Sequence, residues 1–147
     1  MKNNVKLVFE NVETGEKEIL ELHNTECTVG KNSLASRMVG AEKGQVTYFA
    51  VGTGASTGGD APDVSDTELN TELERKQISV RSATGNTANF RVFFNTSEAN
   101  GVLTEIGLFG DDASITADSG TLFARAVIDK TKTSAETLTI DWSLDVD

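Results

Sequence analysis

Apolar and polar residues alternate along residues 5–22, as in strands that bury one face. Val5 and Phe9 share a face in the first half, and a short turn around Gly15 leads into the second half. Two segments of period two on either side of a glycine turn predict a β-hairpin. We expect this hairpin to form an N-terminal arm over residues 1–28.

The rest of the chain, residues 29–147, repeats the period-two pattern in short segments separated by polar turns. Short strands at this spacing predict a mainly β fold, an antiparallel β-sandwich or an open barrel. Trp142 shares a face with Ile140 and Leu144, so we expect it to anchor the last strand in the core. The expected strands lie at residues 45–51, 78–80, 90–94, 102–109, 122–128 and 138–146.

Two short helices are expected beside these strands. The first covers Leu34–Val39, with Asn32-Ser33 as its cap and Gly40 at its end. Ser65 and Glu68 have the spacing of a capping box, which predicts a second helix that runs through Arg75.

The second helix would place Glu72 and Lys76 one turn apart, where they can form an ion pair. The preceding stretch, residues 52–62, is rich in glycine and contains the only proline of the chain, so it predicts a loop. A glycine-rich loop between a strand and a helix is also the setting of phosphate-binding loops. The spacing of its glycines fits neither phosphate motif, and no lysine lies between Lys43 and Lys76. We therefore expect a structural or assembly loop and no bound cofactor.

Composition narrows the classes of function. The 147 residues carry 13 basic and 23 acidic side chains, a formal net charge of −10. Nucleic acid and anionic membranes are poor partners for such a chain, because phosphate binding needs clustered lysine and arginine. The acidity serves solubility or meets a basic partner or divalent cations. The apolar runs are too short to span a membrane, and no secretion signal is expected.

Candidate chemistry is sparse. Cys27 and His23 are the only residues of their types, which excludes an internal disulfide and a Cys/His metal cluster. Asp111 and Asp112 open a short acidic turn, but its spacing does not match a calcium loop, so no metal site is predicted. The sequence therefore gives no metal ligand set and no catalytic residue.

Glu105 lies in an otherwise apolar expected strand, which is unusual for a carboxylate. It could belong to a catalytic pair, but no second acid stands out as its mate. We expect it instead to pair with an arginine, such as Arg75, Arg91 or Arg125, or to point outward. A buried pair of this kind would specify geometry more than add stability.

Two blocks of the sequence carry a resemblance. The first runs from Tyr48-Phe49-Ala50-Val51-Gly52-Thr53-Gly54 to the acidic segment that ends at Arg75, and the second from Thr104 to Leu144. In order they read A-V-G-T-G, D-T-x-L, E-L-x-R, E-I-G-L-F, G-T-L-F-A-R-A, K-T and L-T-I-x-W. This order resembles tail-fibre, tail-collar and baseplate-associated proteins of tailed bacteriophages, over about residues 45–146.

The resemblance implies a non-enzymatic structural component of a phage virion, made in the host cytoplasm and placed in the tail, collar, baseplate or fibre anchor. It implies a homo-oligomer of cyclic symmetry whose partners are other virion proteins, without nucleic acid, membrane or cofactor. We expect Gly52 and Gly54 to allow a sharp turn with positive φ, and Gly107 to let a neighbour approach closely. The candidate structural and interaction residues are Gly52, Gly54, Asp66, Arg75, Glu105, Gly107, Phe109, Arg125 and Trp142.

Two other functions remain open at this point. A module of the tail that binds a host surface or glycan would need exposed aromatic side chains such as Phe93 or Tyr48 beside asparagine-rich loops. A head decoration or head-to-tail connector protein is not separated from a tail protein by sequence, because a fold does not fix a function. An enzyme is the least favoured function, because catalytic residue types are missing.

Overall fold

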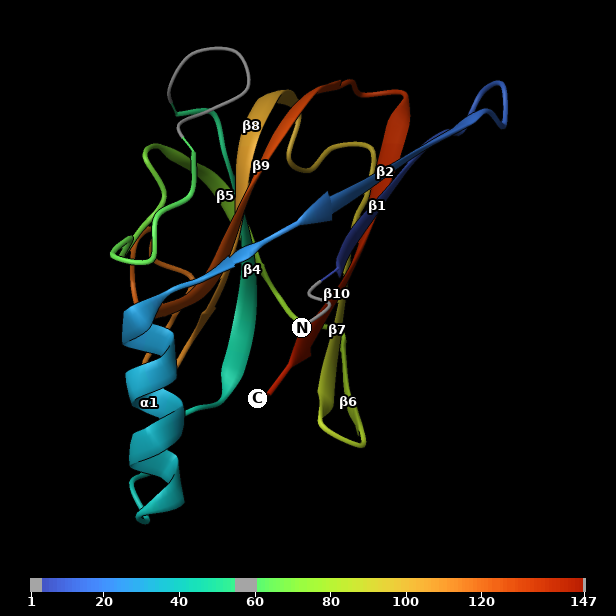
Figure 1. Cartoon of the computed structure of the whole chain (residues 1–147). Coiled ribbons are helices and arrows are strands. Elements are labelled where there is room, and N and C mark those ends of the chain that lie inside the picture. Colours follow the sequence, from blue (N-terminus) through green and yellow to red (C-terminus); the bar gives the residue numbers. More distant parts are fainter. Residues whose placement is uncertain (1–3, 55–60, 147) are drawn as a thin grey trace.

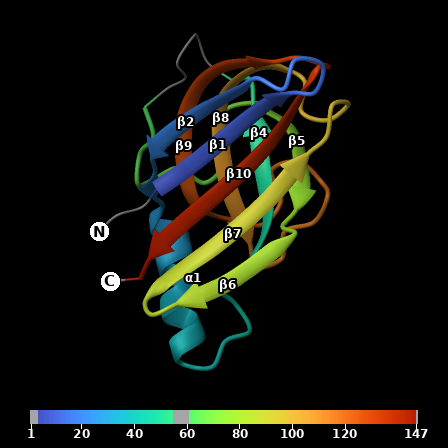
Figure 2. The same ribbon diagram turned by 90° about the vertical axis from the view of Figure 1, so that its right-hand side faces the viewer.

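The computed structural model describes residues 4–54 and 61–146, and within them ten strands form two antiparallel sheets of five strands each (Figure 1). The two sheets pack face to face as a β-sandwich, and Figure 2 shows the first sheet in front of the second. Sheet A contains, in spatial order, β2 (Lys17–His23), β1 (Asn4–Asn11), β10 (Glu136–Asp145), β7 (Thr87–Phe94) and β6 (Val80–Thr84). Sheet B contains β3 (Thr25–Glu26), β9 (Thr121–Lys132), β8 (Gly101–Gly110), β4 (Val46–Gly52) and β5 (Glu72–Gln77).

The main core lies between the sheets and follows the alternation of the sequence. Val5, Leu7 and Phe9 of β1 point into it, and their neighbours in β1 are exposed or half-buried. Trp142 of β10 is fully buried and lies with its ring 6.0 Å from that of Phe49 on sheet B. The predicted sandwich and the inward position of Trp142 are thus confirmed.

The N-terminal hairpin of β1 and β2 is built into sheet A. β1 pairs along its whole length with β10, and Val5 lies opposite Trp142. The hairpin was expected to form an arm, and its two strands instead belong to sheet A.

The helix α1 (Thr28–Met38) begins six residues before the expected start at Leu34. Cys27 stands at its N-cap in extended backbone, and no side chain caps the helix. Gly30 explains the earlier start, because a Cβ there would lie 2.6 Å from the Cα of Phe123. Glycine lets the first turn of α1 pack directly on β9, and this contact replaces the local capping signal.

The second expected helix is absent, and its prediction from Ser65 to Arg75 is wrong. Ser65 instead donates its hydroxyl to Asp63, and residues 72–77 form β5, which pairs with β4. The expected ion pair between Glu72 and Lys76 is not formed either, because a strand places these side chains differently from a helix turn. Pairing with β4 has overridden a local helix signal here.

A buried charge network on the outer face of sheet B

Sheet B buries side chains on both of its faces. Phe49 and Leu108 face the core between the sheets, whereas Ala50 and Phe109 pack with Leu69 in a second cluster on the outer face. The loop segment 61–71, which precedes β5, supplies Leu69 to this cluster. The outer face of sheet B is therefore covered by the chain's own loops.

A row of four residues crosses this outer face, one from each of four neighbouring strands. Arg125 lies opposite Gly107, Gly107 opposite Ala50, and Ala50 opposite Arg75. The small residues in the middle leave room for Leu69, whose Cδ2 would lie 3.0 Å from a Cβ at Gly107. The predicted close approach at Gly107 is confirmed, and two arginines flank the point of contact.

Glu105 is fully buried beside this row, and both of its carboxylate oxygens are occupied. It accepts backbone N–H groups from Gly54 at 3.2 Å, Asn70 at 2.8 Å and Thr71 at 2.9 Å. Arg125 adds Nε at 3.2 Å and Nη2 at 3.1 Å, both to Oε1. A carboxylate has about four lone-pair sites, so these five donors saturate it. The predicted pairing of Glu105 with an arginine is confirmed, and Arg125 is its partner.

Gly52 and Gly54 are required by this carboxylate. A Cβ at Gly52 would lie 2.6 Å from Cγ of Glu105, and a Cβ at Gly54 would lie 2.5 Å from the backbone nitrogen of Thr71. Neither glycine has a positive φ, so the expectation of a left-handed turn at these positions is wrong. The glycines allow the backbone to come within hydrogen-bonding distance of Glu105.

Arg125 joins the buried carboxylate to a second acid nearer the surface. Its Nη1 lies 3.2 Å from Oδ2 of Asp66, and the side chain of Arg125 is only 2% exposed. Asp66 belongs to the segment that covers the outer face. One arginine thus links β9, β8 and the covering loop.

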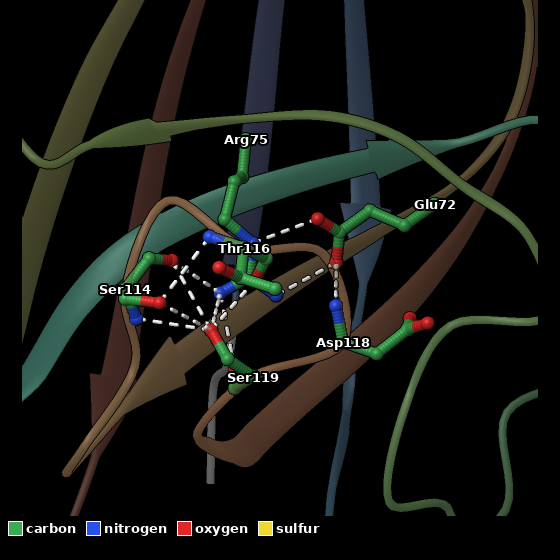
Figure 3. A network of polar contacts seen from close by, with 6 residues as sticks. All are labelled: Glu72, Arg75, Ser114, Thr116, Asp118 and Ser119. Atoms are coloured by element: carbon green, nitrogen blue, oxygen red, sulfur yellow. Dashed lines mark hydrogen bonds and ion pairs between the residues drawn. The ribbon is translucent and has the colours of Figure 1, made fainter.

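A second buried ion pair holds another loop against sheet B (Figure 3). Arg75 donates Nε and Nη2 to the two oxygens of Glu72, each at 2.7 Å. Its Nη1 donates to the backbone carbonyls of Ser114 and Ser119, each at 3.0 Å. Glu72 also accepts the N–H of Asp118 at 3.2 Å. Together these contacts fix the loop between β8 and β9, which covers the outer face beside β5.

The ring of Phe109 packs against Arg75 of this second pair. The guanidinium carbon of Arg75 lies 4.6 Å from the centre of the Phe109 ring and 5.7 Å from that of Tyr48. Such stacking suits arginine, whose planar group can form hydrogen bonds at its edge and contact rings with its face.

The structure brings all but one of the candidate residues together. Trp142 lies in the core between the sheets, apart from the others. The group assembled on the outer face of sheet B contains Gly52, Gly54, Asp66, Arg75, Glu105, Gly107, Phe109 and Arg125.

Sequence reasoning missed a third polar cluster, around Asp111. This residue has a φ of 58° and accepts hydrogen bonds from Ser33 Oγ of α1 and from the N–H of Gly44 at 2.7 Å. Burial alone would raise the pKa of Asp111, but these hydrogen bonds outweigh it and lower the pKa below its ordinary value. No spacing in the sequence signals a contact between segments so far apart.

Sequence reasoning also missed the structural role of Lys132. It is buried at the end of β9 and donates Nζ to the carbonyl of Asn95 at 3.0 Å and to Oδ1 of Asn100 at 2.7 Å. Burial lowers its pKa. These bonds tie the loop between β7 and β8 to sheet B.

The surroundings of Cys27 limit the reactivity of its thiol. The thiol of Cys27 is buried, and burial together with the charge of Asp66 raises its pKa to about 12, so it is protonated at neutral pH.

Among residues 4–54 and 61–146, no three His, Cys, Asp or Glu side chains are placed to hold a metal ion. No helix of the described chain is long and apolar enough to cross a membrane.

Comparison with known proteins does not add a relative. No family model matches the chain, and the searches of curated proteins and of solved structures gave no match either.

Proposed function

We propose that the chain is a non-enzymatic structural component of a tailed-phage virion, a tail, collar, baseplate or fibre-anchoring protein that assembles through protein–protein contacts. The observation that carries this proposal is that residues of the resembling sequence blocks form structural contacts. Glu105, Arg125 and Arg75 stand in the sequence blocks that resemble phage tail proteins, and each is committed to holding a loop against sheet B. A carboxylate saturated by five donors is poorly suited to transfer protons, but well suited to fix a shape.

Sheet A supports the assembly part of the proposal. All five residues of its edge strand β6 are exposed, and within the described part of the chain this strand pairs with β7 alone. β6 contains no proline, and Arg81 is its one charged residue of the kind that natural proteins place on edges to prevent strand addition. On the outer face, Phe93 and Ile19 are 45% and 53% exposed. An open edge and a partly apolar face are features of surfaces that meet other proteins.

The experiment that tests the proposal is mass spectrometry of phage particles purified from cells that encode the chain, with immunogold imaging of the same particles. We expect the chain in the particles, with label on the tail. Label on the head would favour a decoration or connector protein instead. Absence from intact particles would contradict the proposal.

A glycan-binding module is the second candidate function, and Phe93 is the observation that favours it. Phe93 is 45% exposed on the outer face of sheet A, and Asn95 comes directly after the end of the same strand. Aromatic rings beside amide groups are common in sugar sites. Binding on a glycan array that Phe93→Ala abolishes would support this function, and silence at high protein concentration would remove it.

A further inference from the structure

The edge strand β6 offers one side of its backbone to a partner. It is the last strand of sheet A, and Figure 2 shows it along the border of the sheet. It pairs with β7 in unbroken register, from Val80 opposite Arg91 to Thr84 opposite Thr87. A regular, exposed edge of this kind is a template for a further strand.

The turn between β6 and β7 determines which residues of β6 face outward. Residues 85–86 form a two-residue turn, so Thr84 and Thr87 close it as a hydrogen-bonded pair. Hydrogen-bonded pairs alternate along an antiparallel ladder, so every second residue counted back from Thr84 turns its N–H and C=O groups toward β7. The carbonyl of Arg91 agrees with this order, because it faces β6 and accepts the N–H of Ser79.

Arg81 and Ala83 are therefore the residues of β6 whose N–H and C=O groups point away from β7. The guanidinium of Arg81 does not cover this edge, because its Nη1 donates to the carbonyl of Val46 in β4 at 3.3 Å. Each copy of the protein thus presents two outward N–H groups and two outward C=O groups along β6.

Charge distinguishes β6 from β2, the edge strand on the other side of sheet A. β2 exposes Lys17, Glu18 and Glu21, so two copies paired there would bring glutamates together. β6 and β7 contain no acidic residue, and Asp141 of the next strand is already paired with Arg91. Because each copy carries a formal net charge of −10, two copies should meet where acids are absent.

The sequence of β6 also fits itself in one antiparallel register. When Ser82 lies opposite Ser82 of a second copy, Arg81 lies opposite Ala83, and every outward N–H and C=O group of both strands finds a partner. On the outer face, Val80 then lies opposite Thr84, and the two serine hydroxyls meet. Pairs of β-branched residues and pairs of hydroxyls stabilise neighbouring strands.

The neighbouring registers are less favourable. A pairing centred on Arg81 places two arginines opposite each other, and like charges in that position are destabilising. A pairing centred on Ala83 places Arg81 opposite Gly85, which lies in the turn beyond the strand. The strand therefore specifies its own copy in a single register.

We propose that β6 pairs with β6 of a second copy about a two-fold axis at Ser82, which joins the two copies of sheet A into one continuous antiparallel sheet. The same surface is used on both copies, so the contact closes as a dimer. This inference rests on the proposed function, since it names the surface and the partner through which assembly begins.

The dimer is expected to be weak in dilute solution. A pair of five-residue strands covers less than the roughly 800 Å² per partner of a standard interface. Two acidic copies also repel each other, so the dimer should gain strength with salt as the Debye length falls from about 10 Å at 0.1 M to about 3 Å at 1 M. The test must therefore trap the contact as well as weigh it.

An engineered cysteine provides that test. Ser82→Cys is oxidised at high protein concentration and high salt and analysed on a non-reducing gel. We expect a covalent dimer, because residues directly opposite each other have Cβ atoms about 4.5–5.5 Å apart, close to the separation that a disulfide needs. The buried, protonated thiol of Cys27 should take no part.

Two residues of the same strand and face serve as matched controls. Val80→Cys and Thr84→Cys each place the thiol far from its own counterpart, so each alone should give about tenfold less dimer than Ser82→Cys. An equimolar mixture of the two controls, one of them carrying a mass tag, should give the mixed dimer. Equal yields from all three single variants, or no dimer from Ser82→Cys, would overturn the proposed pairing. A mixture that gives no mixed dimer would contradict the register.

A proline then tests the backbone contact. Ala83→Pro removes an outward N–H and leaves the hydrogen bonds to β7 in place, so the fold should tolerate it on this edge. By symmetry the change removes one hydrogen bond from each copy, and self-association measured by sedimentation should fall by about tenfold or more. The midpoint of urea denaturation should stay close to that of the wild type. Unchanged self-association in a folded variant would contradict strand pairing at β6.

The outcomes separate this inference from the proposed function. Particles that contain the chain, together with no dimer specific to Ser82→Cys, would leave the virion assignment and remove the pairing. A specific dimer from a chain that is absent from particles would do the reverse.

Discussion

The Arg125–Glu105 pair on the outer face of sheet B and the Arg91–Asp141 pair on the outer face of sheet A join the same kinds of group but differ in burial. On sheet B, Arg125 lies 3.1 Å from Glu105, and both side chains are at most 2% exposed. On sheet A, Arg91 lies 2.6 Å from Asp141, with 55% and 37% of the side chains exposed. The shorter pair is the one that water and salt reach, so contact length alone does not rank the two.

The difference lies in what remains when one partner is removed. Without Asp141, Arg91 is still solvated and loses little. Without Glu105, the guanidinium of Arg125 loses its buried carboxylate and keeps Asp66, which lies nearer the surface, and three backbone N–H groups lose their acceptor. Breaking a buried pair is costly even where the pair adds little net stability, because the remaining charge has no water to replace its partner. The buried pair therefore determines whether the loops of sheet B hold their shape.

Glu105→Gln should give the largest effect. The amide keeps the shape of the side chain but removes the charge that balances Arg125 and turns an NH2 group toward N–H donors. We expect a loss of about 3–5 kcal/mol in the free energy of unfolding, measured by urea denaturation. A loss below about 1 kcal/mol would show that the network is not needed for stability.

Two glycines on the same face allow a graded test of the space around this network. Gly54→Ala places a methyl group against the backbone of Thr71 and should cost about 2–3 kcal/mol. At Gly107→Ala the nearest atoms are the side-chain ends of Leu69 and Leu122 and the ring edge of Phe109, so this change should cost about 1 kcal/mol. The order of the two midpoints in urea is the readout, and the reverse order would contradict the assigned contacts.

Asp111 should make stability depend on pH. Its folded-state pKa lies below the ordinary value of 3.8, so its charge stabilises the fold fully above that value. The contribution is lost as the pH falls through the lower, folded-state pKa. Asp111→Asn should tolerate the positive φ and cost about 1–2 kcal/mol at pH 7 through weakened hydrogen bonds.

The measurement for Asp111 is urea denaturation of wild type and variant between pH 7 and pH 3. The difference between them should shrink as the pH falls below 3.8. Asp112→Asn, which changes the exposed neighbouring residue, is the matched control and should show no such convergence. A difference that stays constant over this range would refute the assigned role of Asp111.

The parts of the fold that could be predicted from the sequence are those where one residue pattern has one physical cause. Alternation in β1 and β10 predicts a buried face, and Trp142 lies on it. The segment from Ser65 to Arg75 shows the limit of such reasoning. Its capping signal is real but local, and the pairing of β5 with β4 outweighs it, which no spacing within the segment reveals.

The residues of the candidate site also differ in how far the sequence predicts their roles. Glu105 stood out because a carboxylate in an apolar strand needs a partner, and this argument needs only the sequence. The choice of Arg125 among three arginines depends on the register of β8 and β9, which the sequence does not determine. The sequence identifies Gly52 and Gly54 as positions that need glycine. It does not tell whether the cause is a close approach of the backbone or a positive φ, because glycine serves both.

Asp141→Asn should give the smallest effect and completes the comparison. The Arg91–Asp141 pair is bidentate, with contacts of 2.6 Å and 3.0 Å, yet its exposure leaves both groups solvated after separation. We expect a change below about 1 kcal/mol, which shrinks further in 1 M salt as screening removes what attraction remains. The effect of Glu105→Gln should persist in the same salt, because ions do not reach that pair. If the two variants were equally sensitive to salt, burial could not be what separates the two faces.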